Sequence, residues 1–195
     1  MAEQVPPNLL RPLVDLGRWL EAIQAQAVVI GGVAASFLGQ PRFTQDIDAL
    51  AIISESEWTA AVTAAGHYGI VPRIDDAVGF AHQSRVLLLR HQETSIDIDI
   101  ILGGLPFEED AVANGKRYVI GGVSVRLPKV EDLMIMKAVA HRPRDLQDIE
   151  GLLRAHPNLD LQSVRQWIRE FASVTAMSDL IDDFDKLLAR LNRLP

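Results

Sequence analysis

The sequence predicts an α+β fold in which a small mixed β-sheet with flanking helices is followed by a C-terminal helical bundle. Up to residue 128, short runs rich in Val and Ile alternate with segments of helical periodicity. From residue 129 onward the apolar spacing is helical throughout. We therefore expect an α/β core over 1–128 and a helical region over 129–195.

The first elements follow from apolar spacing and from the residues that begin or end helices and strands. Leucines at helical spacing predict a helix over Asn8–Gln24, entered after two prolines. Val28–Ile30 is a short apolar strand that runs into a turn at Gly31-Gly32, and a helix over Val33–Leu38 follows. Further predicted elements are a strand over 46–53, a helix that starts with the capping-box pattern 54–57 and continues to 65, strands over 84–90 and 94–102 joined by a hairpin turn, a short helix over 107–114 and two β segments within 118–127.

The second region contains four predicted helices. Pro143, Pro157 and the stretch 175–178 separate them. They are expected at 129–141, 144–155, 161–173 and 178–192.

Composition excludes several classes of function. The 195 residues include 26 acidic and 19 basic side chains, a net charge of −7, which argues against a general surface for nucleic acid. The absence of cysteine excludes disulfides, thiolate metal sites and a cysteine nucleophile. The longest apolar run, 27–39, is too short to cross a bilayer, and the N-terminus lacks a signal-peptide pattern. We expect a cytoplasmic protein with no membrane partner.

Two pairs of carboxylates lie inside apolar strands. Asp46 and Asp48 form one pair, and Asp97 and Asp99 form the other. Residues i and i+2 of a strand point to the same side, so each pair projects together, and the repulsion favours a bound cation such as Mg²⁺. Either pair alone is also explained by a strand end that faces water. The presence of two pairs in one small domain favours acids that converge on a metal site.

The glycine pair Gly31-Gly32 is the third part of this arrangement. A strand that runs into two glycines and then a helix lets backbone N–H groups approach phosphate oxygens closely. An ordinary strand–helix turn explains the same residues, and the pattern matches neither the Rossmann nor the P-loop motif.

Taken together, these residues resemble a known signature. Gly31-Gly32, thirteen further residues and then Asp46-Ile47-Asp48 resemble the DNA polymerase beta-like nucleotidyltransferase superfamily, which also has a third carboxylate on a later strand. The stretches Gly31–Ser36 and Arg42–Asp48 are similar to the AbiEii-like toxin branch of bacterial toxin–antitoxin pairs. That branch also carries a helical Lys and an Arg-Asp-x-x-Asp element, whose places Lys137 and Arg144–Asp148 occupy here. The resemblance covers roughly Val28 to Leu153.

The resemblance implies a nucleotidyltransferase core with two Mg²⁺ ions held by Asp46 and Asp48. The third carboxylate would be Asp97 or Asp99, and we favour Asp99 because it directly precedes the run that ends the strand. It could act as general base or complete a two-metal clamp.

The resemblance also implies which residues contact the nucleotide. Gly31 and Gly32 would bind the phosphates of an NTP, and Lys137 would face the triphosphate, although it can also be read as a surface lysine. Nucleotide contacts are predicted from Arg42, Thr44 and Arg144. Arg42 and Thr44 can also be read as loop residues without a role. Asp145 and Asp148 are expected to orient Lys137 or the neighbouring basic residues rather than bind metal.

The implied activity is Mg²⁺-dependent transfer of a nucleoside monophosphate from an NTP to a hydroxyl acceptor, a tRNA or a protein in a toxin-like enzyme, with an antitoxin as partner. One alternative is an antibiotic or other small-molecule acceptor. Another is a non-catalytic member of the fold that binds a nucleotide or a partner protein.

Overall fold

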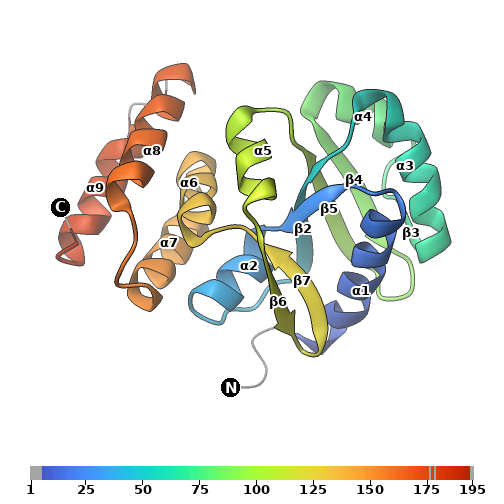
Figure 1. Ribbon diagram of the computed structural model, residues 1–195, viewed down its shortest axis with the longest axis horizontal. Coiled ribbons are helices and arrows are strands. Elements are labelled where there is room, and N and C mark those ends of the chain that lie inside the picture. Colours follow the sequence, from blue (N-terminus) through green and yellow to red (C-terminus); the bar gives the residue numbers. More distant parts are fainter. Residues whose placement is uncertain (1–5, 176, 178, 194–195) are drawn as a thin grey trace. The chain divides into compact units, whose positions relative to one another are not determined.

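The computed structural model describes residues 6–175, 177 and 179–193, and the chain divides into two compact units. The first unit comprises residues 1–37 and 41–128, and the second comprises 38–40 and 129–195. Figure 1 labels the helices and strands of both. The α+β fold with a mixed sheet and C-terminal helices is confirmed.

A five-stranded mixed sheet forms the centre of the first unit, in the order β1-β2-β5-β4-β3. Its strands are β1 (Gln26–Val29), β2 (Asp46–Ile52), β3 (Ile70–Pro72), β4 (Val86–His91) and β5 (Ile96–Leu102). The β2–β5 pair is parallel, and the three other pairs are antiparallel. The two central strands, β2 and β5, are those that carry the acidic pairs.

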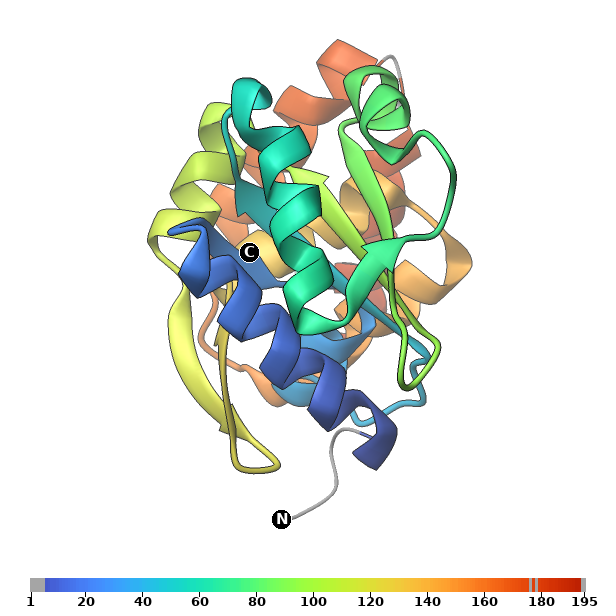
Figure 2. The same cartoon turned by 90° about the vertical axis from the view of Figure 1, so that its right-hand side faces the viewer.

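One face of this sheet is fully buried. Alternate residues such as Ile47, Ala49, Ile98 and Ile100 have no exposed surface, as expected for side chains that project to one side of each strand. Helices α1 (Pro7–Ala22) and α3 (Trp58–Ala65) lie side by side across the sheet (Figure 2), and they are joined by a hydrogen bond from the Trp19 indole N–H to the Ala61 carbonyl of 3.0 Å.

A buried histidine fixes α1 to the β4–β5 hairpin. His91 Nε2 lies 3.2 Å from Asp15 Oδ2 of α1, and its Nδ1 lies 2.9 Å from Thr94 Oγ1 of the hairpin turn. All hydrogen-bonding atoms of this ring therefore have partners, and the contacts place α1 on the buried face.

The remaining elements of the first unit surround the sheet and include a separate two-stranded hairpin. The hairpin strands are antiparallel and turn through Gly121-Gly122, both with positive φ. These elements are α2 (Gly31–Leu38), the 3₁₀ turns η1 (Glu55–Glu57) and η2 (Gly66–Tyr68), α4 (Ala77–Ser84), α5 (Pro106–Ala113), β6 (Lys116–Ile120) and β7 (Val123–Leu127).

Four helices make up most of the second unit: α6 (Val130–Ala140), α7 (Pro143–Ala155), α8 (Leu161–Thr175) and α9 (Asp179–Arg190). All four predicted helices form, with ends shifted by a few residues. Their apolar side chains, such as Leu133, Leu152, Ile168 and Phe184, are buried.

Three local features differ from expectation. Gly31 and Gly32 form the first turn of α2 rather than a turn before it. The Ser54 side chain makes no capping hydrogen bond, and the first residues of the predicted helix form the 3₁₀ turn η1. The segment 70–84 contains β3 and α4, which no periodicity predicted, because β3 has three residues and α4 is only weakly amphipathic. Its one sequence signal is Asp76, whose carboxylate accepts the Gly79 N–H at 2.8 Å.

Candidate functional site

The four strand carboxylates lie together on one face of the sheet. In the parallel ladder Asp46 is paired with Asp97 and Asp48 with Asp99, so the side chains form a two-by-two array. This face is opposite the one that His91 and α1 cover, because residues alternate along each strand. The predicted convergence of the two pairs is therefore present in the structure.

Two arginines contact the acids of β5. Arg73, which directly follows β3, places Nη1 2.7 Å from Asp97 Oδ2 and Nη2 2.7 Å from Asp99 Oδ1. Arg90 of β4 donates its Nε–H to the other oxygen of Asp97 at 2.7 Å. Both oxygens of Asp97 therefore accept hydrogen bonds from arginine, whereas one oxygen of Asp99 does.

The two acids of β5 differ in their electrostatics. The hydrogen bond from Arg90 and the neighbouring Arg73 keep the pKa of Asp97 below its ordinary value, against a smaller opposing effect of burial. Burial raises the pKa of Asp99, the charges of Asp97 and Asp46 add to this increase, and Arg73 opposes it. Of the two acids of β5, Asp99 is thus the one whose negative charge is less well compensated.

The glycine pair lies against the acids of β2 and the loop that precedes them. A β-carbon at Gly31 would lie 1.8 Å from Asp48 Oδ2, and Gly31 has a φ of +61°, so both space and backbone conformation require glycine. A β-carbon at Gly32 would lie 2.3 Å from Thr44 Oγ1 and 3.0 Å from Arg42 Nη2. The structure thus brings these predicted residues together.

Thr44 and Arg42 are held in defined positions in this loop. Thr44 is buried, and its hydroxyl donates to Asp46 Oδ1 at 2.7 Å. The Arg42 backbone N–H donates to Ser36 Oγ at 3.1 Å, which ties the loop to α2. Thr44 therefore orients a carboxylate that the sequence predicted as a metal ligand.

The donor chemistry of this array fits a hard divalent cation. Mg²⁺ takes oxygen ligands and is usually held by one or two carboxylates, with water and substrate phosphate as further ligands. Asp46 and Asp48 supply such carboxylates beside the glycine pair. Within the described part of the chain, no three His, Asp or Glu side chains converge on one point in the manner of a complete metal cage. Asp99, the third acid of the predicted set, forms an ion pair with Arg73.

The remaining predicted residues, Lys137 and Arg144, belong to the second unit. Lys137 is buried, and its ammonium lies 2.9 Å from Asp145 Oδ1 and 2.8 Å from Asp148 Oδ2. Arg142 also binds Asp145, at 2.6 Å. Burial would raise the pKa of Asp145, but the hydrogen bonds from Arg142 and Lys137 outweigh it and lower the pKa. The expected contact of the Asp-x-x-Asp element with Lys137 is present, and Arg144 is exposed in the first turn of α7.

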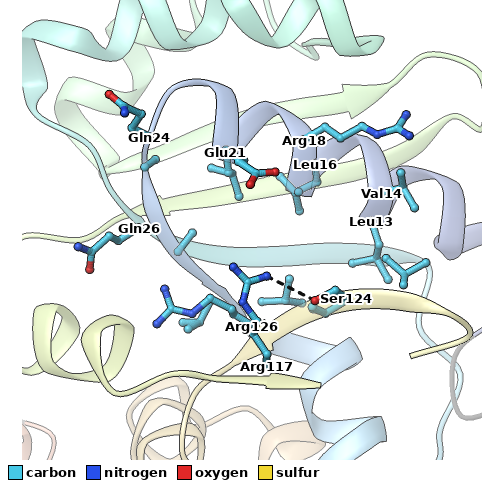
Figure 3. Close-up of a pocket in the computed structure, with 18 of the residues that line it drawn as sticks. Leu13, Val14, Leu16, Arg18, Glu21, Gln24, Gln26, Arg117, Ser124 and Arg126 are labelled. Carbon is cyan, nitrogen blue, oxygen red and sulfur yellow. Dashed lines mark hydrogen bonds between the residues drawn. The ribbon is translucent and has the colours of Figure 1, made fainter. Parts of the chain in front are cut away.

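A groove of about 530 Å³ lies away from the acids, between α1, β1 and the β6–β7 hairpin (Figure 3). Leucines such as Leu13 and Leu16 line it together with Arg117 and Arg126. Arg117 Nη1 lies 3.5 Å from Ser124 Oγ, and Arg126 donates to the carbonyl oxygens of Val112 and Gly115. None of the predicted site residues lines this groove, so its volume is not a reason to place the chemistry there.

Arg73 and Arg90 are the site residues that sequence reasoning missed. Arg73 follows a strand too short to show a period, and its contacts are with residues far along the chain. The alternation of Arg90 with Leu89 and His91 in a predicted strand could have placed it on the face opposite the buried one.

The sequence was compared with known protein families and with curated proteins. A family model described as nucleotidyl transferase of unknown function (DUF2204) matches residues 10–181. No sequence among curated proteins matches the chain. Within the described residues, no helix is long and apolar enough to cross a membrane.

Several solved structures share the fold at low sequence identity. The antibiotic-resistance factor ANT(2'')-Ia is 15% identical with a TM-score of 0.59, over 88% of this chain and 95% of that one. An antigenic nucleotidyltransferase-like protein from Paracoccidioides brasiliensis is 15% identical with a TM-score of 0.56, over 92% and 94%. The lincosamide antibiotic adenylyltransferase LnuA is 16% identical with a TM-score of 0.53, over 78% and 99%.

Proposed function

The chain belongs to the DUF2204 family of nucleotidyl transferases, and from this membership we propose a Mg²⁺-dependent enzyme that transfers a nucleoside monophosphate from an NTP to a hydroxyl group of a small acceptor molecule. The observation that carries the proposal is the two-by-two array of carboxylates beside a glycine pair. A sheet does not require four acids on one face in order to fold. Such acids can bind metal ions, and the metal ions in turn bind the phosphates of a nucleotide.

In this proposal each residue has a separate role. Asp46 and Asp48 hold the metal, and Thr44 keeps Asp46 oriented through its hydroxyl. Bound Mg²⁺ would neutralise charge on the phosphates and favour the leaving pyrophosphate. Asp99 is the third carboxylate, which accepts the proton of the acceptor hydroxyl or completes the metal ligands.

The nucleotide is expected to lie on the glycine side of the array. Gly31 and Gly32 are the first two residues of α2, and the first N–H groups of a helix have no partner within the helix, so phosphate oxygens could accept hydrogen bonds from these two residues. Arg42, close to Gly32, adds a positive charge at the same place. The role of Lys137 beside the triphosphate stays a prediction, since its ammonium already binds Asp145 and Asp148.

The preference for a small acceptor rests on the solved structures. The antibiotic-resistance factor ANT(2'')-Ia and the lincosamide antibiotic adenylyltransferase LnuA are matched over 95% and 99% of their own length. Nearly the whole of each of these proteins therefore shares the fold of the present chain. This similarity supports an acceptor of the same class without naming the compound.

A toxin-like enzyme with a tRNA or protein acceptor and a cognate antitoxin is the second candidate. The specific observation in its favour is that Lys137 binds Asp145 and Asp148, the two acids of the Arg-Asp-x-x-Asp element that is similar to the AbiEii-like branch.

The test is transfer of label from each α-labelled NTP, with Mg²⁺, to a panel of lincosamide and aminoglycoside antibiotics, to total tRNA and to a cell extract. We expect labelled product from the wild type, loss of product in EDTA, and a decrease of about 10³-fold or more in Asp48→Asn, since the metal-binding carboxylate is removed. Asp110→Asn, at an exposed position of α5, is the matched control and should keep full activity. Label transfer that persists in EDTA or in Asp48→Asn would contradict the proposal, and labelled tRNA or protein would select the second candidate.

A further inference from the structure

The guanidinium group of Arg73 lies between the two acids of β5. One arm binds Asp97 and the other binds Asp99, each at 2.7 Å, and only 21% of the arginine side chain is exposed. A planar guanidinium fork that reaches two carboxylates at once fixes the distance between them. The contact is therefore a largely buried ion pair with two carboxylates rather than an exposed surface pair.

The two arms of Arg73 differ in what else holds their partners. Arg90 binds the other oxygen of Asp97 at 2.7 Å, so an arginine contacts each of the two oxygens of this carboxylate. Among the described residues, Asp99 has Arg73 alone as a cationic partner, and its cross-strand neighbour on β4 is Leu88. The Asp97 arm is thus a fixed anchor, and the Asp99 arm is the contact that can be exchanged.

A metal ion and Arg73 cannot both occupy Asp99 without cost. Two cations at one carboxylate repel each other, and a guanidinium at 2.7 Å blocks the approach to the oxygen that it binds. Without any cation, however, Asp46, Asp97 and Asp99 would repel one another on adjacent strands. The array therefore needs either the arginine or the metal at this place.

We propose that Arg73 is the positioning residue of Asp99: anchored on Asp97, it holds the third carboxylate in place in the metal-free protein and yields it to a metal ion when the site is loaded. This inference rests on the proposed function, because it takes Asp99 as a member of the metal-binding set. It assigns Asp97 to the anchor of Arg73 rather than to the metal. The raised pKa of Asp99 agrees with a carboxylate whose compensation is partial.

The test measures Mn²⁺ affinity without nucleotide or acceptor, by electron paramagnetic resonance of the free ion. Arg73→Met removes the competing cation, and we expect it to bind Mn²⁺ about three- to tenfold more tightly than the wild type. Arg90→Met removes the same charge from Asp97 without a contact to Asp99, so its gain in affinity should be clearly smaller than that of Arg73→Met, and an equal gain would overturn the inference. Asp99→Asn in the Arg73→Met background should abolish the gain, because the exchanged ligand is then absent.

Other outcomes overturn the inference. Unchanged or weaker Mn²⁺ binding in folded Arg73→Met, with normal circular dichroism, would mean that Arg73 supports the acids without competing for them. If Arg73→Met does not fold, Arg73→Lys takes its place: a single ammonium cannot hold both carboxylates as the fork does, so tighter Mn²⁺ binding is again expected and its absence defeats the inference. Label transfer by the wild type together with unchanged affinity in the variants defeats this inference alone. Absence of both Mn²⁺ binding and transfer in the wild type defeats the proposed function as well.

Discussion

Each unit of the molecule holds a cluster of carboxylates, and the two clusters differ in how their charge is compensated. In the helical unit, Asp145 and Asp148 are buried and share one buried ammonium, that of Lys137. In the sheet unit, Asp97 and Asp99 are each 33% exposed, and their arginine partners reach them from β4 and from the position that follows β3. The first cluster is closed and the second is open to solvent.

This difference separates a structural ion cluster from a chemical one. A buried pair that loses one member leaves an uncompensated charge, so the helical cluster can change partners only at a large cost in stability. The sheet cluster contains four acids and is within reach of water, so a cation can enter without unfolding the unit. Substitutions should therefore affect stability in the helical unit and metal or nucleotide binding in the sheet unit.

The largest effect on stability is expected from Lys137→Met. It leaves Asp145 and Asp148 buried without their ammonium partner, and the free energy of unfolding should fall by about 3 kcal/mol. Urea unfolding measures the change. Lys186→Met, which removes an exposed lysine paired with Asp183, is the matched control and should leave the stability almost unchanged. Equal effects of the two substitutions would break the comparison.

The next effect is expected from Gly31→Ala in the sheet unit. The added β-carbon would collide with the Asp48 carboxylate, and the positive φ adds backbone strain, so we expect a loss of about 2 kcal/mol together with weaker Mn²⁺ binding. Thermal unfolding and an Mn²⁺ titration measure the two quantities. In Gly17→Ala, a position in the middle of α1 with no atom near the new methyl group, stability should rise by about 0.5 kcal/mol or more. A neutral Gly31→Ala would show that Asp48 has room to move.

A smaller effect is expected from Thr44→Val. The substitution keeps the shape of a buried side chain and removes the hydroxyl that orients Asp46, so Mn²⁺ should bind about three- to tenfold more weakly while the fold is retained. Thr63→Val, where the hydroxyl bonds the Thr59 carbonyl on an exposed helix surface, should leave Mn²⁺ binding unchanged. If both variants bind Mn²⁺ like the wild type, Thr44 has no part in the site.

The smallest effect is a difference in acid titration between the clusters. Asp145 should titrate below its ordinary pKa of 3.8 and Asp99 above that value, as measured by carboxyl carbon chemical shifts in metal-free protein. The signs follow from linkage. Ionised Asp145 stabilises the fold at pH values above its ordinary pKa, and this stabilisation is lost as the pH falls through its lowered pKa. Ionised Asp99 opposes folding at neutral pH, and this is relieved as the pH falls through its raised pKa. Shifts of the same sign at both residues would contradict the contrast.

Local sequence patterns were enough to predict that the acids and the glycine pair belong to one candidate site. The i, i+2 spacing of Asp46 with Asp48, and of Asp97 with Asp99, predicted which side chains share a face, since the two-residue period is a property of the strand itself. The parallel register that brings the pairs together depends on how β2 meets β5, two strands far apart in the chain. That information lies in tertiary packing and not in either segment.

Other features were hidden for similar reasons. Arg73 extends from the end of a strand of three residues, and nothing local indicates which acids it reaches. The short helix α4 lacks a clear apolar stripe, so periodicity did not detect it. Lys137 was read either as a nucleotide contact or as a surface lysine, because spacing along α6 does not tell whether α7 brings Asp145 against it. Burial settled the second alternative: this lysine is not on the surface.

The parallel pairing of β2 with β5 also has a consequence for the order of events during folding. The two strands are separated along the chain by η1, α3, η2, β3, α4 and β4, so their ladder closes a long loop and forms only after an unfavourable search. The helices depend on short-range contacts and are expected to appear earlier. When the unfolded chain is diluted from denaturant, Mn²⁺ binding should therefore return later than the helical circular dichroism signal. The rate at which binding returns would then report the formation of the β2–β5 ladder.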